Sequence, residues 1–212
     1  MNSRSKWSTR KRAPQAGCSI ARGVNPESWG VFVKSMDYII RRATLDDREA
    51  IETLIVESAR SLSRKDYSRQ QIEAAIRTVF GVDTNLILDG TYFVADSSGR
   101  LIGCGGWSKR KTLFGGDRYA IRDSSELDRA SEPAKIRAFF VHPEYARRGI
   151  SRAILSMCES EARSSGFRSV ELMATLPGLK LYRACGYKED VPLKYEIEAG
   201  VKIEFVPMRK WL

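Results

Sequence analysis

The sequence predicts an α/β (α+β) protein with a mixed, mostly antiparallel central sheet of about seven strands, flanked by helices. The first observation is the order of its elements: strand, two helices, three strands, helix, strand, helix, two strands, without an internal repeat. The second is a buried apolar strand that stops at Pro143 and is followed by a helix and another strand, the pattern of a single crossover. The third is a hairpin around Gly99, which is typical of antiparallel neighbours.

Composition places the chain among soluble globular proteins. Its 212 residues suit one domain, and its 42% apolar and 29% charged residues are near the averages for folded chains. No apolar run approaches the roughly 18 residues that cross a bilayer, so we expect no membrane association. Four scattered cysteines and a single histidine argue against a disulfide scaffold or a metal site, and they favour a reducing cytoplasm.

Most of the positive charge lies near the N-terminus. Residues 1–35 carry seven basic side chains against Glu27 alone, and so hold +6 of the formal net charge of +10. We expect residues 1–36 to be a basic, disordered extension and residues 37–212 to form the folded domain. Three explanations of the extension stay open: a nucleic-acid-binding arm, a transit peptide, and translation from upstream of a native start at Met36, which we favour.

Apolar spacing places the elements of the first half. Thr44, followed by two aspartates, is a favourable helix start. The glycines at 103–106 would weaken a strand, so they indicate a bulge or a close approach to its backbone. The elements expected are a strand at 38–43, helices from Thr44 and over 68–80, and strands at 91–95 and 101–107.

The second half begins with a long polar stretch, residues 108–134. A loop of this length is either a binding element or lid, or a plain solvated insertion. The elements expected beyond it are a buried strand at 136–141, a helix from Ile150, a strand at 169–175, a short helix starting near Pro177, and strands at 193–198 and 201–208.

The turn between Val141 and Arg152 is the centre of the chain. A glycine-containing turn between a buried strand and a helix leaves backbone N–H groups free at the helix's positive end, which is a geometry that holds phosphate. Arg147, Arg148 and Arg152 add positive charge, and Gly149 lacks the Cβ that would keep a phosphate off the backbone. From these residues alone, an ordinary turn with solvated arginines remains an equal alternative.

Three other chemistries are excluded by residue counts and spacing. Residues 149–153 come close to a nucleophile elbow, but that triad needs a histidine downstream and the only one, His142, lies upstream. The same count excludes a histidine-based metal site, and no P-loop pattern is present.

The order of elements and two motifs resemble the GNAT superfamily of acyl-coenzyme A dependent N-acyltransferases. Residues 140–151 (FVHPEYARRGIS) follow the family's strand, proline and Q/R-x-x-G-x-G/A pattern, and residues 181–187 (LYRACGY) resemble its C-terminal motif. The resemblance covers about residues 38–209. It implies an N-acetyltransferase that uses acetyl-coenzyme A as co-substrate and no metal, and the cysteine usage described above places it in the cytoplasm.

The resemblance also implies roles for individual residues. Backbone groups of Phe139 and Val141 would pair with the pantetheine arm, and Tyr182 would be the general acid that protonates the departing thiolate. A half-buried structural tyrosine is the alternative for Tyr182. The pyrophosphate would be cradled by Arg147, Arg148, Gly149, Ile150, Ser151 and Arg152.

Several positions depart from the family pattern or leave roles open. Ala146 and Ser151 replace the usual Gln or Arg and the usual Gly or Ala, and Leu176 and Pro177 stand where many members carry an asparagine. No acid lies on the central strand, so the general base stays unassigned among the candidates Asp117, Glu171 and Glu196.

The acceptor is expected to be a small-molecule or peptide amine, which attacks the thioester directly. The basic run Lys109-Arg110-Lys111 suggests an acidic acceptor or, more simply, a solvated surface. A homodimer is possible, and nucleic acid is a less favoured partner. The competing functions are a non-catalytic acetyl-coenzyme A sensor and a basic-tailed nucleic-acid-binding protein.

Overall fold

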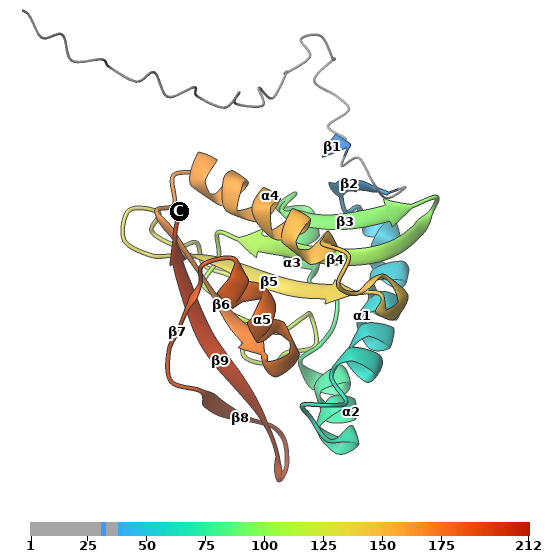
Figure 1. The fold of residues 1–212 in the computed structure, drawn as a ribbon. Coiled ribbons are helices and arrows are strands. Elements are labelled where there is room, and N and C mark those ends of the chain that lie inside the picture. Colours follow the sequence, from blue (N-terminus) through green and yellow to red (C-terminus); the bar gives the residue numbers. More distant parts are fainter. Residues whose placement is uncertain (1–30, 33–37) are drawn as a thin grey trace, which may run out of the picture.

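The computed structural model describes residues 31–32 and 38–212, which form one mixed sheet with helices on both faces (Figure 1). The strand order is β1-β2-β3-β4-β5-β6-β9-β7, with β8 paired to β9. Only β5 and β6 run parallel, and every other pair of neighbours is antiparallel. The strands are β1 (Val31–Phe32), β2 (Ile39–Arg42), β3 (Tyr92–Ser97), β4 (Arg100–Ser108), β5 (Ala134–Val141), β6 (Ser169–Thr175), β7 (Lys188–Glu189), β8 (Leu193–Glu198) and β9 (Val201–Trp211).

The four helices predicted from sequence lie between these strands in the expected order, with a further short helix in addition. The α-helices are α1 (Arg48–Leu62), α2 (Arg69–Thr78), α3 (Thr84–Leu88), α4 (Ile150–Ser164) and α5 (Leu179–Ala184), and short 3-10 turns occur at η1 (Leu45–Asp47), η2 (Pro143–Tyr145) and η3 (Leu176–Gly178). None of the described helices is long and apolar enough to cross a membrane.

The predicted fold class is confirmed, with three additions. All seven expected strands are present, and the very short strands β1 and β7 extend the sheet at its two ends. Helix α3 was not predicted. The rest of the expected N-terminal extension lies outside the described residues, and Val31–Phe32 within it pairs with β2.

Capping residues explain where the first two helices begin. Thr44 and Asp47 form a reciprocal capping box at η1, which leads directly into α1. Ser68 does the same for α2, because its hydroxyl accepts from the N–H of Gln71 while the Gln71 side chain accepts from the Ser68 N–H. Both starts are readable in the sequence because capping uses neighbouring residues.

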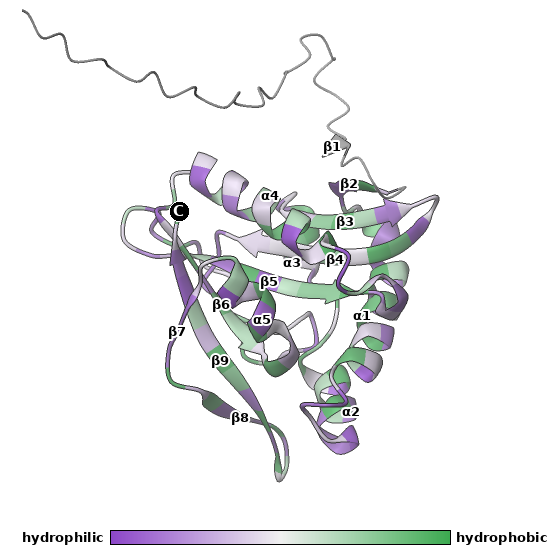
Figure 2. Cartoon of the chain, in the orientation of Figure 1, coloured by the Kyte–Doolittle hydropathy of each residue, from purple (hydrophilic) through white to green (hydrophobic). Residues whose placement is uncertain are grey.

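Each face of the sheet carries its own apolar core. Helix α4 packs on one face through Ile150, Ile154 and Leu155, all of which are buried. Helices α1 and α2 cover the other face, with Ile51 and Ile72 among the buried contacts. Figure 2 shows apolar residues along the central strands and mixed polar and apolar residues along α4. The first four residues of β3, Tyr92 to Ala95, are apolar and buried, so this part of the strand is covered on both faces.

The long polar stretch 108–134 is fixed to the domain at several points. Gly116 donates its N–H to the carbonyl of Val79, and the guanidinium of Arg137 on β5 donates to the carbonyl of Gly115. Arg137 is also ion-paired with Asp83 at 2.6 Å, and both side chains are almost completely buried. Arg137 therefore links the loop, through the carbonyl of Gly115, to the buried Asp83 beside the sheet.

Candidate active site

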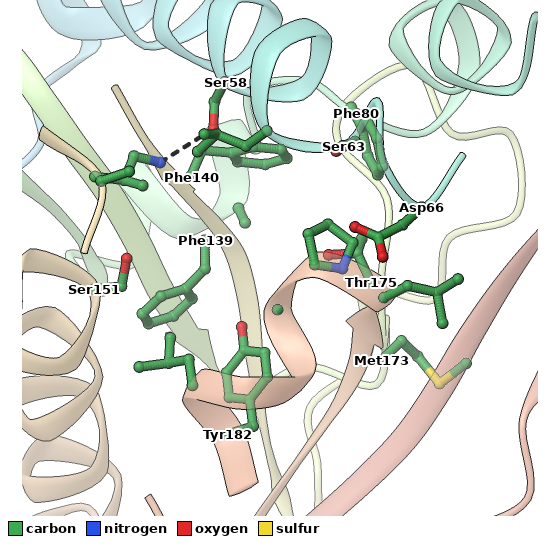
Figure 3. Close-up of a pocket in the computed structure, with 18 of the residues that line it drawn as sticks. Ser58, Ser63, Asp66, Phe80, Phe139, Phe140, Ser151, Met173, Thr175 and Tyr182 are labelled. Carbon is green, nitrogen blue, oxygen red and sulfur yellow. Dashed lines mark hydrogen bonds between the residues drawn. The ribbon is translucent and has the colours of Figure 1, made fainter. Parts of the chain in front are cut away.

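The central strands separate and leave a groove between them. Strands β5 and β6 pair only at Ala134 with Val170 and at Lys135 with Glu171, although both strands continue well beyond these residues. Lys135, Glu171 and Arg209 form an ion-pair cluster at the last paired position. Past that point the two strands diverge, and a groove of about 1060 Å³ opens between them. Figure 3 shows side chains of both strands around it.

A bulge in β5 shapes one wall of this groove. The register shifts between Cys104 and Gly106 of β4, because β5 carries an extra residue there, and Ala138 has a left-handed φ of 56°. The ring of Phe139 then lies against Gly105, where a Cβ would come within 2.8 Å of the ring. The prediction of a bulge or close approach at these glycines is confirmed in both respects.

The bulge is followed by a stretch of strand whose backbone groups alternate between β4 and the groove. His142 donates its N–H to the carbonyl of Ile102 on β4 at 2.9 Å. Because N–H groups alternate along a strand, those of Phe139 and Val141 face the groove. The N–H of Val141 is not free there, since it donates to the hydroxyl of Ser58 on α1 at 3.3 Å (Figure 3). Ser58 was not predicted from sequence.

The turn after β5 has the backbone geometry of an anion site. Arg147 and Gly149 adopt left-handed φ values of 66° and 86°, and Gly149 caps helix α4. Ile150 is buried and fixes the start of the helix. Within the described chain, no acceptor takes the N–H groups of residues 147–152, and the first helical bond runs from Ala153 to Gly149. Successive free amides at a helix N-terminus are what an anionic ligand requires.

Arginine side chains surround this turn without acidic partners. Arg147, Arg148 and Arg152 are exposed, and none forms an ion pair with any described residue. The guanidinium of Arg148 stacks over the ring of Tyr145 at 5.1 Å. Ser151, in the first turn of α4, also lines the groove. Free amides and guanidinium groups without acidic partners at one turn are chemically suited to a phosphate-bearing group.

Tyr182 enters the groove from the other side. It lies on α5, it is 7% exposed, and Figure 3 shows its hydroxyl directed into the groove beside Phe139. The two rings meet edge to face, with centroids 6.4 Å apart. Burial raises the pKa of the Tyr182 phenol well above its ordinary value, so the group keeps its proton throughout the neutral range. A protonated hydroxyl in a cleft is suited to donate.

The structure brings eight of the nine site residues predicted from sequence to the groove. The groove is lined by Phe139, Val141, Arg147, Gly149, Ile150, Ser151, Arg152 and Tyr182, and Arg148 lies in the same turn. Its far end is formed by the turn between α1 and α2, by loop residues 113–116, by the end of β6 and by Phe205 of β9.

Comparison with protein-family models identifies the family of this chain. Residues 51–187 match the model of the acetyltransferase (GNAT) family, which is more than half of the chain. The chain belongs to this family. A GNAT acetyltransferase is the enzyme class that the two motifs indicated. No curated protein sequence matches the chain significantly.

Solved structures share the GNAT fold at low sequence identity. A GCN5-related N-acetyltransferase from Rhodopseudomonas palustris is 19% identical with a TM-score of 0.60, covering 86% of this chain and 100% of its own. PaiA N-acetyltransferase from Thermoplasma acidophilum, solved with coenzyme A, is 18% identical with a TM-score of 0.57, covering 84% and 100%. YncA from Salmonella typhimurium, a putative acetyltransferase solved with acetyl-coenzyme A, is 16% identical with a TM-score of 0.55, covering 84% and 95%.

None of the three carboxylates considered as the base of this GNAT enzyme lines the groove. Asp117 accepts hydrogen bonds from Thr84 and pairs with Arg122, and Glu196 accepts from the N–H of Gly200. Burial opposes ionisation of Glu171, but hydrogen bonds from Lys135 and Arg209 hold its pKa below the usual range. The groove is instead lined by Asp66, in the turn between α1 and α2.

The departures from the family pattern also have structural outcomes. Ala146 and Ser151 both line the groove, so both positions are open to contact with a ligand. Leu176, the first residue after β6, donates its N–H to the hydroxyl of Tyr67 at 2.9 Å. The N–H at this position is therefore occupied within the protein. The basic run at 109–111 lies away from the groove, with Lys109 and Arg110 paired to acids.

Proposed function

We propose that this GNAT enzyme moves an acetyl group from acetyl-coenzyme A directly to an amine. The observation that carries the proposal is the continuity of the groove, which runs from the free amides and arginines of residues 147–152, past the Tyr182 hydroxyl, to the turn between α1 and α2. One end fits the pyrophosphate and the other admits an acceptor.

The edge of β5 would hold the pantetheine arm. Phe139 and Val141 turn their backbone groups toward the groove, where amide groups of an extended ligand pair as a neighbouring strand does. Pairing at Val141 requires the Ser58 hydroxyl to release the N–H that it now accepts. The bulge at Ala138 adds a bent backbone segment beside the position of the thioester, where a backbone N–H can polarise the carbonyl.

Transfer needs a neutral amine and a proton for the leaving group. The acceptor nitrogen attacks the carbonyl carbon, the carbon–sulfur bond breaks, and Tyr182 delivers its hydroxyl proton to the departing thiolate. The nitrogen loses one proton as the amide forms, and this proton restores the Tyr182 hydroxyl through water. Before the attack, the ammonium form of a lysine-like amine must lose a first proton, which at pH 7 costs about 4.6 kcal/mol. Asp66 is positioned at the acceptor end to attract the ammonium form and to receive this proton through water.

The experiment that tests the site compares two glycines of equal geometry. Gly149 and Gly99 have φ values of 86° and 85°, and neither has any atom within 4 Å of an added Cβ. Valine at either position strains the backbone similarly, by about 1–3 kcal/mol. We expect Gly149→Val to abolish coenzyme A binding in titration calorimetry, while Gly99→Val, in the remote β3–β4 hairpin, binds normally. Micromolar affinity retained by Gly149→Val would exclude the proposed cradle.

A further inference from the structure

Three of the charges that line the groove lie on one short turn. Residues 64–66 connect α1 to α2 and present Arg64, Lys65 and Asp66 at the groove. Arg64 and Lys65 are exposed, and neither forms an ion pair within the described chain. Figure 3 shows Asp66 of this turn and Ser151 of α4 on opposite sides of the groove, so Arg64 and Lys65 are additional to the cations expected at the pyrophosphate.

This turn is held in place by the rest of the fold. The hydroxyl of Tyr67 donates to the carbonyl of Glu204 at 2.7 Å and accepts from the N–H of Leu176 at 2.9 Å, which ties the turn to β9 and to the end of β6. Inside the turn, Asp66 and Tyr67 both donate their N–H groups to the carbonyl of Ser63. These bonds fix the backbone that carries the three charges, so the turn loses little backbone entropy on binding a ligand.

The side chains differ in what they face. Figure 3 shows the Asp66 carboxylate directed toward Thr175, at the end of β6, where an acceptor amine would approach. Behind it the wall is apolar, formed by Phe80, Phe140 and Met173. An ammonium group is attracted by Asp66, and the neighbouring cations are left to interact with a negative group on the same molecule.

We infer that the acceptor is an amine that also carries a carboxylate, with the amine near Asp66 and the carboxylate near Arg64 and Lys65. This inference rests on the proposed function and names its substrate class. The carboxylate belongs either to a small amino acid or to an acidic side chain near a peptide N-terminus. Both present the same chemistry to the turn.

Matched acceptor pairs test this inference. One arm compares 5-aminopentanoate with 5-aminopentanamide, and the other compares peptides that begin Ala-Asp or Ala-Asn and are amidated at the C-terminus. Thiol release from acetyl-coenzyme A should give a kcat/KM at least tenfold higher for the carboxylate member in one arm. The preference should shrink as salt rises from 50 to 500 mM, because exposed charges are screened.

Variants assign the preference to the turn. Arg64→Ala/Lys65→Ala should reduce the preference at least fivefold without changing the KM for acetyl-coenzyme A. The matched control is Arg69→Ala/Lys202→Ala, which removes the same charges from exposed positions that do not line the groove. An equal kcat/KM for both members of each pair, or an equal loss of preference in the control, would overturn the inference.

The outcomes separate this inference from the proposed function. If the protein binds acetyl-coenzyme A and acetylates amines without regard to a carboxylate, only the inference fails. If coenzyme A does not bind at all, the proposed function fails first. If coenzyme A binds without turnover, calorimetric titration of each acceptor pair into the coenzyme A complex decides, and equal affinity for the two members overturns the inference.

Discussion

Replacing Asp83 by asparagine should destabilise the protein more than any surface charge change. Asp83 and Arg137 have side chains that are 1% and 2% exposed, and their ion pair spans 2.6 Å. Arg137 also holds the loop through the carbonyl of Gly115. Asparagine keeps the volume and the capping oxygen for α3, so the change isolates the charge.

The magnitude follows from leaving a buried guanidinium without its carboxylate. Burial lowers the pKa of Arg137 and the charge of Asp83 opposes that shift, so removing Asp83 removes its main compensation. Breaking a buried pair from one side costs about 3–5 kcal/mol. With an m-value of about 2 kcal/mol/M, the urea midpoint should fall by about 1.5–2.5 M.

Urea unfolding followed by circular dichroism measures this loss, and a double variant tests its cause. Asp83 pairs with Arg122 as well as with Arg137, which is the more deeply buried of the two. Arg137→Met in the Asp83→Asn background removes that buried charge and should recover at least 1 kcal/mol, about the scale of a coupled pair. Glu73→Gln, which breaks the exposed Arg60–Glu73 pair, is the control and should leave the midpoint nearly unchanged. A loss below about 1 kcal/mol for Asp83→Asn, or strict additivity in the double variant, would refute this reasoning.

Three further outcomes test the site and its supports. Tyr182→Phe should lower kcat by about 10²–10⁴ at pH 7 with unchanged coenzyme A affinity. The difference in kcat from the parent should narrow above pH ~8.5, where a thiolate leaves without a proton. Turnover equal to the parent at every pH would exclude the acid role. Ser58→Ala frees the Val141 N–H, and coenzyme A should bind about fivefold tighter by calorimetry, equivalent to ~1 kcal/mol; weaker binding would mean that the serine contacts the ligand. Burial raises the pKa of Tyr67 to about 12, so the folded state keeps a proton that the unfolded state releases above about pH 10, and stability falls as pH rises from there. Tyr67→Phe should therefore show a shallower decline of the urea midpoint between pH 10 and 12, and an unchanged slope would contradict the assignment.

Elements with strong local signals were predictable from sequence. The capping boxes at Thr44 and Ser68 and the strand–proline–helix pattern around Pro143 depend on neighbouring residues, and the structure places them as expected. Helix α3 could not be predicted because it has only five residues. Its N-cap, Asp83, also forms an ion pair with the distant Arg137, which the local sequence does not reveal. A short apolar segment of this kind has no period to identify it.

The cofactor end of the site was predictable, and the acceptor end was not. Residues 147–152 are consecutive in the sequence and form one turn, so a single sequence motif contains all the groups expected to bind the cofactor. Ser58 meets Val141 across 83 positions of sequence, and Asp66 reaches the end of β6 only through the packing of Tyr67. The three carboxylates considered from sequence have local or cross-strand partners instead, which composition and spacing do not reveal.

The separation of β5 from β6 also bears on self-association. Where the two strands part, each presents an edge of backbone groups in the interior of the sheet rather than at its rim. Exposed edges normally invite a second chain to add a strand and so begin aggregation. Here α1, α5 and the loop at 113–116 stand on either side of the opening. A single extended molecule can enter this opening, but an edge strand that belongs to another sheet cannot. The fold therefore keeps two unpaired strand edges without exposing them to other copies of the protein.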